Sequence, residues 1–422
     1  MRFPALFLLG VFAILPPVTA GDTADRRLLE LTVGKTKHQG RQYVSDAEIC
    51  WLLERDGHLE SIELKQVTEF KQVANTFRPF SAAELRSQLT TELGTGYEAD
   101  IRGNHIAIAP TGQAKTCVEI VDKTSKSFSS YFSRRNFKLD KLEAPMITVV
   151  FRTHNEFLAY CDKGGIKQTK GLLGYYSPMT NRVALYLPQP AAAANTATGD
   201  VGPSLSELAI DSGSAPLDPL LRLTHSGAPP LGSGFADTLA HETTHQMGFN
   251  SGLHSRLGDD PKWVIEGMAM LFEGDANRDD ARQKTNVAQR MNRDRFLWFQ
   301  EYQQARRKPK SLEEFLTSDA LFTTSTLDAY SEAWAFTFFL AETRASNLSG
   351  YLKKLANRTE LGEYTPMKRL GDFKASFGKD LPNLEAHYLR FIQNLETASP
   401  APATPKTPGQ SPPPSSTPVT LR

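Results

Sequence analysis

The sequence predicts an α+β protein, with a β-rich N-terminal module followed by a small mixed sheet, a histidine-bearing helix and a helical lobe. Three observations predict this class. Apolar and polar residues alternate near the N-terminus, as they do in strands with one buried face. Short apolar runs of strand length continue to about residue 187, and turn sequences separate them. After residue 273, apolar residues recur at helical spacing instead.

The N-terminal module is expected to span residues 21–137. In residues 21–75, strand-like runs flank the turn sequence Arg55-Asp56-Gly57. Three further elements are predicted, namely a helix over residues 81–93, a hairpin over 97–108 that turns near Gly103, and a helix over 114–134. The histidines of this module lie near turns, so we interpret them as surface residues: His38, His58 and His105.

The second region is expected to span residues 138–398. A buried strand, a helical turn and two paired strands are predicted over residues 146–151, 155–160, 171–176 and 183–187. Residues 189–232 are rich in Ala, Gly, Ser and Pro and are interpreted as a long surface loop. Helices are then predicted over residues 277–306, 327–344 and 383–397. Ser311 and Glu314 predict a helix that starts with a capping box.

One short motif indicates metal-binding chemistry. His241, Glu242 and His245 belong to an HExxH sequence. Residues four apart on an α-helix lie about 40° apart around its axis, so both imidazoles point the same way and Glu242 stands beside them. A catalytic zinc ion takes three protein ligands and keeps its fourth position for water. The motif therefore predicts a zinc site that needs one more ligand. In the alternative interpretation, the histidines pair with carboxylates or fill a core.

Spacing separates the candidates for the third ligand. In the longer HExxHxxGxxH pattern of metzincins, the last histidine position holds Ser251, and His254 falls three residues late. Glu266 fits better, because the Asp-Pro sequence at 260–261 predicts a helix start with Asp as N-cap, and Gly274 predicts its end. A second helix carrying Glu266 can then face the first, while His254 stays the alternative.

The sequence around Glu266 resembles that of gluzincins, which pair HExxH with a glutamate on a following helix. Their run of the form W-x-x-E-G-x-A-x-x-x-E is matched by Trp263, Glu266, Gly267, Ala269 and Glu273. More narrowly, the chain resembles a family of exported bacterial gluzincin-like proteins known only as a domain of unknown function, over about residues 140–395 and including 330–335. The resemblance implies a thermolysin-like fold, a zinc ion held by His241, His245 and Glu266, and hydrolysis of peptide bonds.

In such a site, further residues have candidate roles. Glu242 would act as general base, taking a proton from the attacking water and passing it to the leaving amine. Tyr330 is the candidate donor to the oxyanion, and packing in the helical lobe is the alternative. Glu273 is either an outer partner of a ligand histidine or a solvated residue. Residues 174–176 are either an ordinary sheet edge or a strand that pairs with a substrate backbone, as the resemblance suggests.

Composition narrows the function classes. The 422 residues include 48 Lys and Arg against 47 Asp and Glu, a net charge of +1, so no global field favours nucleic acid or an anionic membrane as a partner. We therefore expect an exported zinc-dependent metallopeptidase with a peptide or protein substrate. Two alternatives stay open: a catalytically inactive binding or scaffold protein of the same fold, and a zinc amidase acting on a non-peptide or cell-wall amide.

The two ends of the chain and its cysteines complete the prediction. In residues 1–20, Arg2 precedes an apolar run, and small residues lead to an expected cleavage after Ala20, so we predict a signal peptide and a secreted or periplasmic location. No integral membrane segment is expected after cleavage, and an uncleaved N-terminal anchor is the alternative. The Pro-, Ser- and Thr-rich residues 399–422 predict a disordered tail. The three cysteines are expected to be buried free thiols, with a bridge between Cys50 and Cys117 as the alternative.

Overall fold

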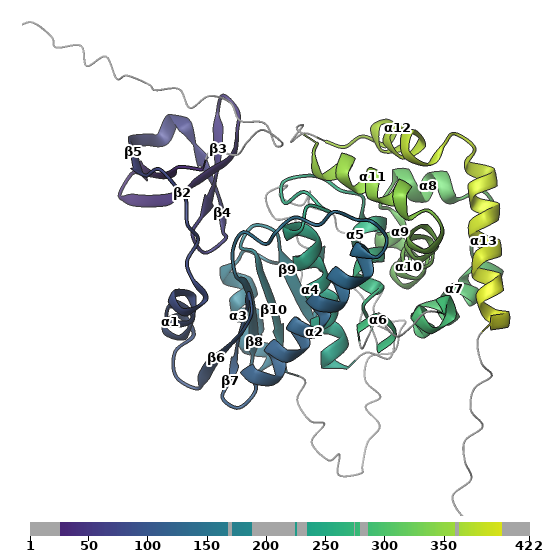
Figure 1. Cartoon of the computed structure of the whole chain (residues 1–422), viewed down its shortest axis with the longest axis horizontal. Helices are drawn as coiled ribbons and strands as arrows, with labels where there is room; N and C mark the ends of the chain where they lie inside the picture. The colour runs from purple at the N-terminus through teal and green to yellow at the C-terminus, as the bar shows by residue number, and fades with distance from the viewer. Residues whose placement is uncertain are drawn as a thin grey trace, which may run out of the picture.

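The computed structural model describes residues 26–167, 171–187, 224–225, 234–273, 275–278, 286–358 and 363–398. Three predicted segments lie wholly or largely outside these residues, namely the signal peptide, the loop over 189–232 and the C-terminal tail. The described part is a mixed α+β structure with two sheets and a helical lobe (Figure 1). The predicted α+β class is therefore confirmed.

The first sheet is antiparallel, with five strands in the order β4-β3-β2-β1-β5. Its elements are β1 (Leu28–Val33), β2 (Thr36–Ser45), β3 (Ile49–Glu54), β4 (Leu59–Glu63), the 3-10 helix η1 (Leu64–Gln66) and β5 (Val67–Ala74). Alternate strand residues point to the same face, so one face buries a small core of Leu31, Cys50, Leu52 and Ile62. The predicted β-rich opening is confirmed, and the turn at residues 55–57 joins β3 to β4.

The second sheet has six strands in the order β11-β9-β10-β8-β7-β6. They are β6 (Tyr97–Arg102), β7 (His105–Pro110), β8 (Met146–Phe151), β9 (Gly174–Ser177), β10 (Arg182–Tyr186) and β11 (Thr224–His225). Strands β7, β8 and β10 are parallel, whereas β6, β9 and β11 pair antiparallel with their neighbours. Because β7 pairs with β8, this sheet crosses the boundary that was expected at residue 138. The first sheet ends with β5, and β6 is the first strand of the second sheet.

Helices cover both faces of the second sheet. They are α1 (Ala82–Leu93), α2 (Ala114–Ser133), α3 (His154–Lys163) and α4 (Phe235–Asn250). In β7, Ile106 and Ile108 pack towards α1 and α3, whereas Ala107 and Ala109 pack towards α2 and α4. This alternation follows from the two-residue repeat of a strand. The small alanines let the second pair of helices lie close to the sheet.

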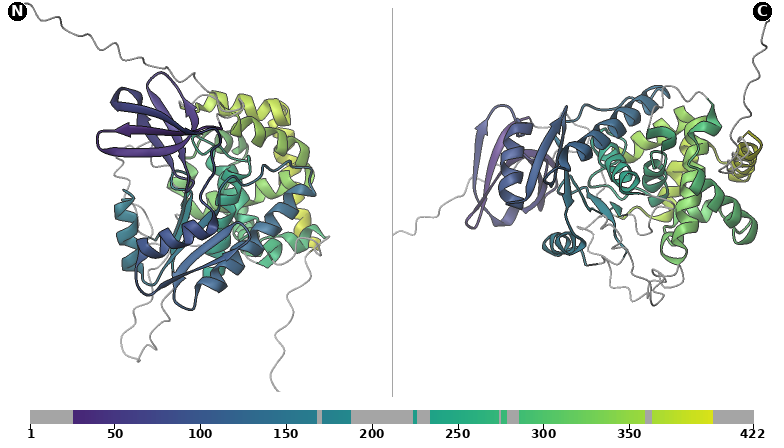
Figure 2. Two further views of the ribbon diagram at one scale, coloured as in Figure 1. Left: turned by 60° about the vertical axis from the view of Figure 1, so that its left-hand side comes forward. Right: turned by 90° about the horizontal axis from the view of Figure 1, so that it is seen from below.

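The remaining helices form the C-terminal lobe. They are α5 (Lys262–Met270), α6 (Asp275–Arg278), the 3-10 helix η2 (Val287–Arg290), α7 (Arg293–Ala305), α8 (Leu312–Thr317), α9 (Leu321–Thr324), α10 (Thr326–Thr343), α11 (Ala345–Ala356), α12 (Pro366–Phe377) and α13 (Leu381–Ala398). Helix α10 is buried along most of its length and contacts α5, α7, α11 and α13. Figure 2 shows the first sheet at one end of the molecule, the second sheet in the middle and this lobe at the other end.

Two predictions about the lobe are corrected. The helix expected over residues 277–306 is not continuous, because η2 ends before Met291 and the side chain of Asn292 caps a new helix, α7. Ser311 does precede α8, but its side chain makes no capping hydrogen bond, so the predicted capping box is wrong. Helices α11 and α12 were not predicted from the sequence.

Cysteines and membrane segments can also be compared with the predictions. All three cysteines are buried and free, so the alternative of a bridge between Cys50 and Cys117 is wrong. Burial raises the pKa of each of these thiols to about 12. Within the residues described, no helix has the length and apolar character needed to cross a membrane.

A buried arginine joins the two sheets. Arg256, in the segment after α4, donates hydrogen bonds to the backbone oxygens of Pro178 at 2.7 Å, Met179 at 3.1 Å and Gly57 at 2.7 Å. The first two lie in the turn between β9 and β10, and Gly57 lies in the turn between β3 and β4. The backbone N–H of Leu59 also donates to Met179 at 2.8 Å. The N-terminal sheet is thus fixed against the hairpin that forms one side of the second sheet.

Candidate metal centre

Helix α4 places three of the predicted site residues next to one another. It runs without a break over Phe235–Asn250 and contacts β9, β10 and α5. The buried side chain of Gln246 anchors it, because Nε2 donates to the backbone oxygens of Ile147 at 3.1 Å and Asn181 at 2.8 Å. The HExxH residues are thereby fixed relative to the sheet.

Helix α5 supplies Glu266 from the opposite side. The predicted helix is present but begins one residue late, with Pro261 rather than Asp260 as its N-cap residue. The Asp260 carboxylate accepts a hydrogen bond from the backbone N–H of Ser255 at 3.1 Å instead. It therefore closes the loop between the two helices. On its other side, α5 packs against α10 at Gly267.

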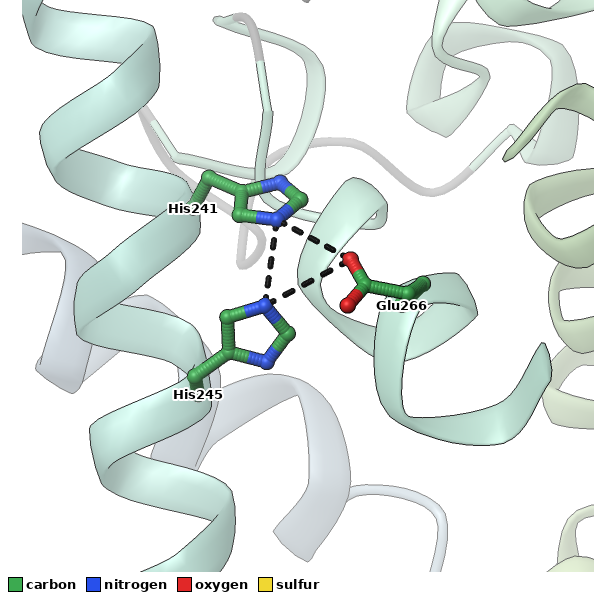
Figure 3. Close-up of side chains that lie close together, drawn as sticks. All are labelled: His241, His245 and Glu266. Carbon is green, nitrogen blue, oxygen red and sulfur yellow. Dashed lines mark hydrogen bonds and ion pairs between the residues drawn. The ribbon is translucent and has the colours of Figure 1, made fainter. Parts of the chain in front are cut away.

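Three donor atoms converge between α4 and α5 (Figure 3). Nε2 of His241 lies 3.1 Å from Nε2 of His245, and Oε2 of Glu266 lies 3.3 Å and 3.6 Å from these nitrogens respectively. Donors bound tetrahedrally to one zinc ion at about 2.0–2.1 Å lie about 3.3 Å from one another, so these separations suit one shared ion. The three buried side chains could hold a metal ion. The structure thus brings the three predicted ligands together.

His254, the alternative third ligand, does not join this group within the described part of the chain. Its Nδ1 faces the Asp260 carboxylate at 3.5 Å, and its ring centroid lies 5.0 Å from that of Phe249. A Cβ at Gly248 would lie 2.7 Å from Cδ2 of His254, so the glycine makes room for this ring while α4 continues past it. His254 is a packed residue beside the site.

The ligand side chains influence one another electrostatically. Burial lowers the pKa of His245 to about 4. Burial also opposes protonation of His241, but hydrogen bonds with Glu266 and Glu273 outweigh it and raise the pKa of His241 to about 10. Burial would raise the pKa of Glu266, yet His245 and His241 together hold it well below its usual range. Glu266 is therefore an anion in contact with both imidazoles.

Glu242 is enclosed beside these ligands. Its side chain is 0% exposed, and among the described residues no side chain donates a hydrogen bond to either carboxylate oxygen, although the backbone N–H of Tyr176 faces the group. Burial raises the pKa of Glu242 to about 8, with His241 opposing this effect and Glu266 adding to it. A buried carboxyl group with so few polar partners is costly, and ionisable groups with strongly shifted pKa values are concentrated at functional sites. The position of Glu242 suits a group that exchanges a proton within the site.

Glu273 is the outer partner of His241, so the solvated alternative is wrong. Its Oε1 lies 3.1 Å from Nδ1 of His241. Arg295 donates from Nε to Oε2 at 2.8 Å and from Nη2 to Oε1 at 2.9 Å, and Asn292 donates from Nδ2 to Oε2 at 3.2 Å. Burial opposes ionisation of Glu273, but Arg295 and His241 outweigh it and lower its pKa to about 2.

Asn292 and Arg295 were not among the site residues predicted from the sequence. Both lie at the start of α7, where Asn292 is the N-cap residue. A cation in the first turn of a helix is electrostatically unfavourable, because the amide groups there carry partial positive charge. Arg293 lies in the same turn and is exposed, so an arginine at this position did not by itself indicate a buried anion.

Tyr330 lies in α10 and is buried. Its ring centroid is 5.5 Å from that of Phe322, and Cζ of Arg295 lies 5.6 Å from its ring. Because Arg295 also holds Glu273, Tyr330 belongs to the surroundings of the ligands. Tyr330 therefore packs within the helical lobe, and its role as a hydrogen-bond donor to an oxyanion stays a prediction.

Strand β9 also borders Glu242. The backbone N–H of Tyr176 opposes the effect of burial on the pKa of Glu242. On its outer edge, β9 already has a partner, because Thr224 and His225 of β11 pair with Tyr176 and Tyr175. A substrate strand that paired with β9 at these residues would therefore take the place of β11.

Part of the chain is similar to a known protein family. Residues 235–362 match the family described as "Protein of unknown function (DUF1570)". The matched segment begins with α4 and extends past α11, so it contains the three ligand candidates as well as Glu273 and Arg295. No curated protein matches the chain.

Proposed function

We propose that the protein is an exported zinc-dependent peptidase of the gluzincin type, with a thermolysin-like catalytic region. The observation that carries the proposal is the convergence of His241, His245 and Glu266 with separations of 3.1–3.6 Å. A structural zinc ion usually takes four protein ligands, whereas a catalytic one takes three and keeps a position open. The group within the described residues has three members, which favours the catalytic kind of site.

The charges of the site also suit a divalent cation. Glu242, Glu266 and Glu273 are buried carboxylates, and Arg295 is the buried cation that pairs with Glu273. Without a metal, the raised pKa values of His241 and Glu242 leave a proton on each, and these two protons balance the buried charges. When both histidines bind a metal as neutral imidazoles and Glu242 is ionised, three negative charges and one positive charge leave a net charge of −2. An unbalanced buried charge is strongly unfavourable, and a divalent cation balances it. Two imidazole nitrogens and one carboxylate oxygen are ligands that zinc prefers.

A zinc ion held by these residues would polarise a substrate carbonyl and lower the pKa of a water molecule beside it. Glu242 takes a proton from that water as the water oxygen attacks the carbonyl carbon. It then passes the proton to the amine nitrogen as the C–N bond breaks, which leaves a carboxylic acid and an amine; transfer of the remaining proton between them gives a carboxylate and an ammonium ion. Tyr330 is proposed as the donor to the oxyanion. No covalent bond to the protein is needed.

The test uses the full-length protein loaded with zinc, and Glu242→Gln as the variant. We expect hydrolysis of peptide libraries or unfolded protein, and a loss of about 10²–10⁴-fold in rate in the variant, because it removes proton transfer while the ligands stay in place. Glu314→Gln, on the exposed side of α8, is the matched control and should keep the full rate. A rate that is unchanged in Glu242→Gln would refute the assigned role of Glu242.

A second candidate is a protein that binds the metal ion but does not hydrolyse a substrate. The low exposure of the ligands favours it, because His241 is 0%, His245 1% and Glu266 4% exposed. Bound zinc without turnover of peptides or cell-wall fragments would support this candidate. Turnover of wall fragments alone would instead identify an amidase that acts on a non-peptide amide.

A further inference from the structure

The Glu273 carboxylate is held on both oxygens by side chains that are themselves buried. Arg295 engages it with two nitrogens of one guanidinium, a geometry that fixes the orientation of a carboxylate as well as its charge. Asn292 adds a donor on the oxygen that His241 does not contact. The carboxylate therefore has no freedom to turn away from His241.

Asn292 and Arg295 are also locked to each other. The Oδ1 atom of Asn292 accepts a hydrogen bond from the backbone N–H of Arg295 at 3.3 Å, which caps α7. The Nδ2 atom of Asn292 donates to the backbone oxygen of Met270 at 3.2 Å as well as to Glu273. The first turn of α7 is thereby attached to the end of α5, the helix that carries Glu266.

This arrangement has a consequence for the ligand itself. A ligand histidine that donates its Nδ1 proton to a carboxylate keeps the lone pair of Nε2 directed at the metal, and such outer partners usually contribute 10–100-fold to affinity. His241 meets Glu273 through Nδ1 and the other ligands through Nε2. If Glu273 could rotate, the ring of His241 would lose the contact that fixes its orientation.

We propose that Arg295 and Asn292 are positioning residues that set the metal affinity of the centre by holding Glu273 against His241. The inference rests on the proposed metal centre but not on hydrolysis. Arg295 acts through Glu273, and its contact with the ring of Tyr330 places the same guanidinium beside the candidate oxyanion donor.

The experiment measures the dissociation constant for zinc of the full chain, by competition with a chromogenic chelator. Arg295→Met should weaken binding by about 10–100-fold. Arg307→Met is the matched control: Arg307 lies just after the other end of α7, its side chain is 3% exposed, and it pairs with Glu332 and Glu385 at 2.8 Å and 2.7 Å. It should lower stability to a similar extent and leave zinc affinity within twofold. Equal weakening by both variants, or unchanged affinity in Arg295→Met, would overturn the inference.

A double-mutant cycle tests whether Arg295 acts through Glu273. In a Glu273→Gln background, Arg295→Met should change zinc affinity by less than about threefold, because the carboxylate that it positions is gone. If Arg295→Met weakened zinc binding in the Glu273→Gln background as much as it does in the wild type, Arg295 would not act through Glu273. The visible spectrum of the cobalt-loaded protein should also change in Arg295→Met and not in Arg307→Met, since it reports ligand geometry.

A milder variant keeps the test decisive if Arg295→Met does not fold. Asn292→Ser retains a helix-capping side chain and removes the amide donor to Glu273, so zinc affinity should fall several-fold while α7 remains capped. Unchanged affinity in this variant would overturn the inference. Wild-type protein that binds no zinc would overturn the metal centre and the inference together, whereas zinc binding without hydrolysis would contradict only the proposed peptidase activity.

Discussion

A Cβ atom at Gly267 would lie 2.1 Å from Oγ1 of Thr337 and 2.4 Å from the backbone oxygen of Ala333. Both contacts belong to α10, and Gly267 directly follows the candidate ligand Glu266 in α5. The two helices therefore approach each other so closely that position 267 accommodates only hydrogen. This contact sets the depth at which α5, and with it Glu266, sits relative to α4.

Gly267→Ala should therefore affect both stability and the metal centre. Forcing a methyl group into this contact should destabilise the protein by about 1–3 kcal/mol and displace Glu266 from the histidines, so zinc affinity should fall as well. Urea unfolding and chelator competition measure the two effects. Gly371→Ala in α12 is the control, because a Cβ there meets nothing within 4 Å, and alanine should stabilise that helix by up to about 1 kcal/mol. Unaltered stability in Gly267→Ala would show that the helices can separate freely.

Zinc should raise the stability of the folded protein. A ligand that binds only the folded state at 100 times its dissociation constant adds about 2.7 kcal/mol to the free energy of unfolding. Thermal unfolding with added zinc, and then with a chelator, should show a rise in melting temperature and its reversal. The same zinc addition should have little effect on Glu266→Gln, which loses an anionic ligand. If added zinc did not change the melting temperature of the wild-type protein, the proposed metal centre would be contradicted.

His105 should make stability depend on pH outside the metal centre. Burial lowers its pKa from 6.5 to about 4, with Asp122 opposing and Lys126 assisting this effect. As the pH falls below 6.5, the unfolded chain takes up a proton that the folded protein does not accept until about pH 4. Stability should therefore be lost over this window, by on the order of 3 kcal/mol at most. Urea unfolding from pH 7.5 to 4 should show a shallower loss in His105→Gln than in the wild type, and identical slopes would contradict the assignment.

Arg256 should couple the first sheet to the rest of the molecule. Arg256→Met leaves the backbone oxygens of Gly57 and Pro178 without their buried donor, so we expect a loss of at least about 2 kcal/mol. Hydrogen exchange should rise in the two turns that these residues occupy. Arg102→Met is the control, because the side chain of Arg102 is 50% exposed and its ion pairs with Glu119 and Asp122 should contribute little. If the amides of both turns stayed protected from hydrogen exchange in Arg256→Met, the proposed coupling would be contradicted.

The ligand set could be predicted because most of its determinants are local. His241 and His245 share a helix, so their common direction follows from spacing alone. Glu266 required only that a second helix pack against the first, and the Asp-Pro sequence at 260–261 predicted that helix. The start of that helix was predicted one residue early, because Asp260 bonds to the loop before it rather than to the helix.

The support of the ligands could not be predicted, because it depends on contacts between distant segments. Arg295 is 22 residues from Glu273 in the sequence, and nothing local couples them. His105 lies next to a turn, which suggested exposure, but packing against other segments buries it. Strand β11 pairs with β9 although their residues are about 50 apart in the sequence. The amino-acid sequence of residues 189–232, where β11 lies, has no strand-like alternation of apolar and polar residues. In each case tertiary packing, rather than local propensity, decided the outcome.

The docking of the first sheet determines how this protein can be shortened. Met179 and Leu257 pack against Trp51 and its apolar neighbours on that sheet. In a recombinant fragment that begins after β5, the side chains of Met179 and Leu257 would be exposed to solvent, and the guanidinium of Arg256 would lack its acceptor at Gly57. Such a fragment should aggregate. Fragments intended for crystals or assays should therefore begin no later than Leu28, even though every candidate ligand lies more than two hundred residues downstream.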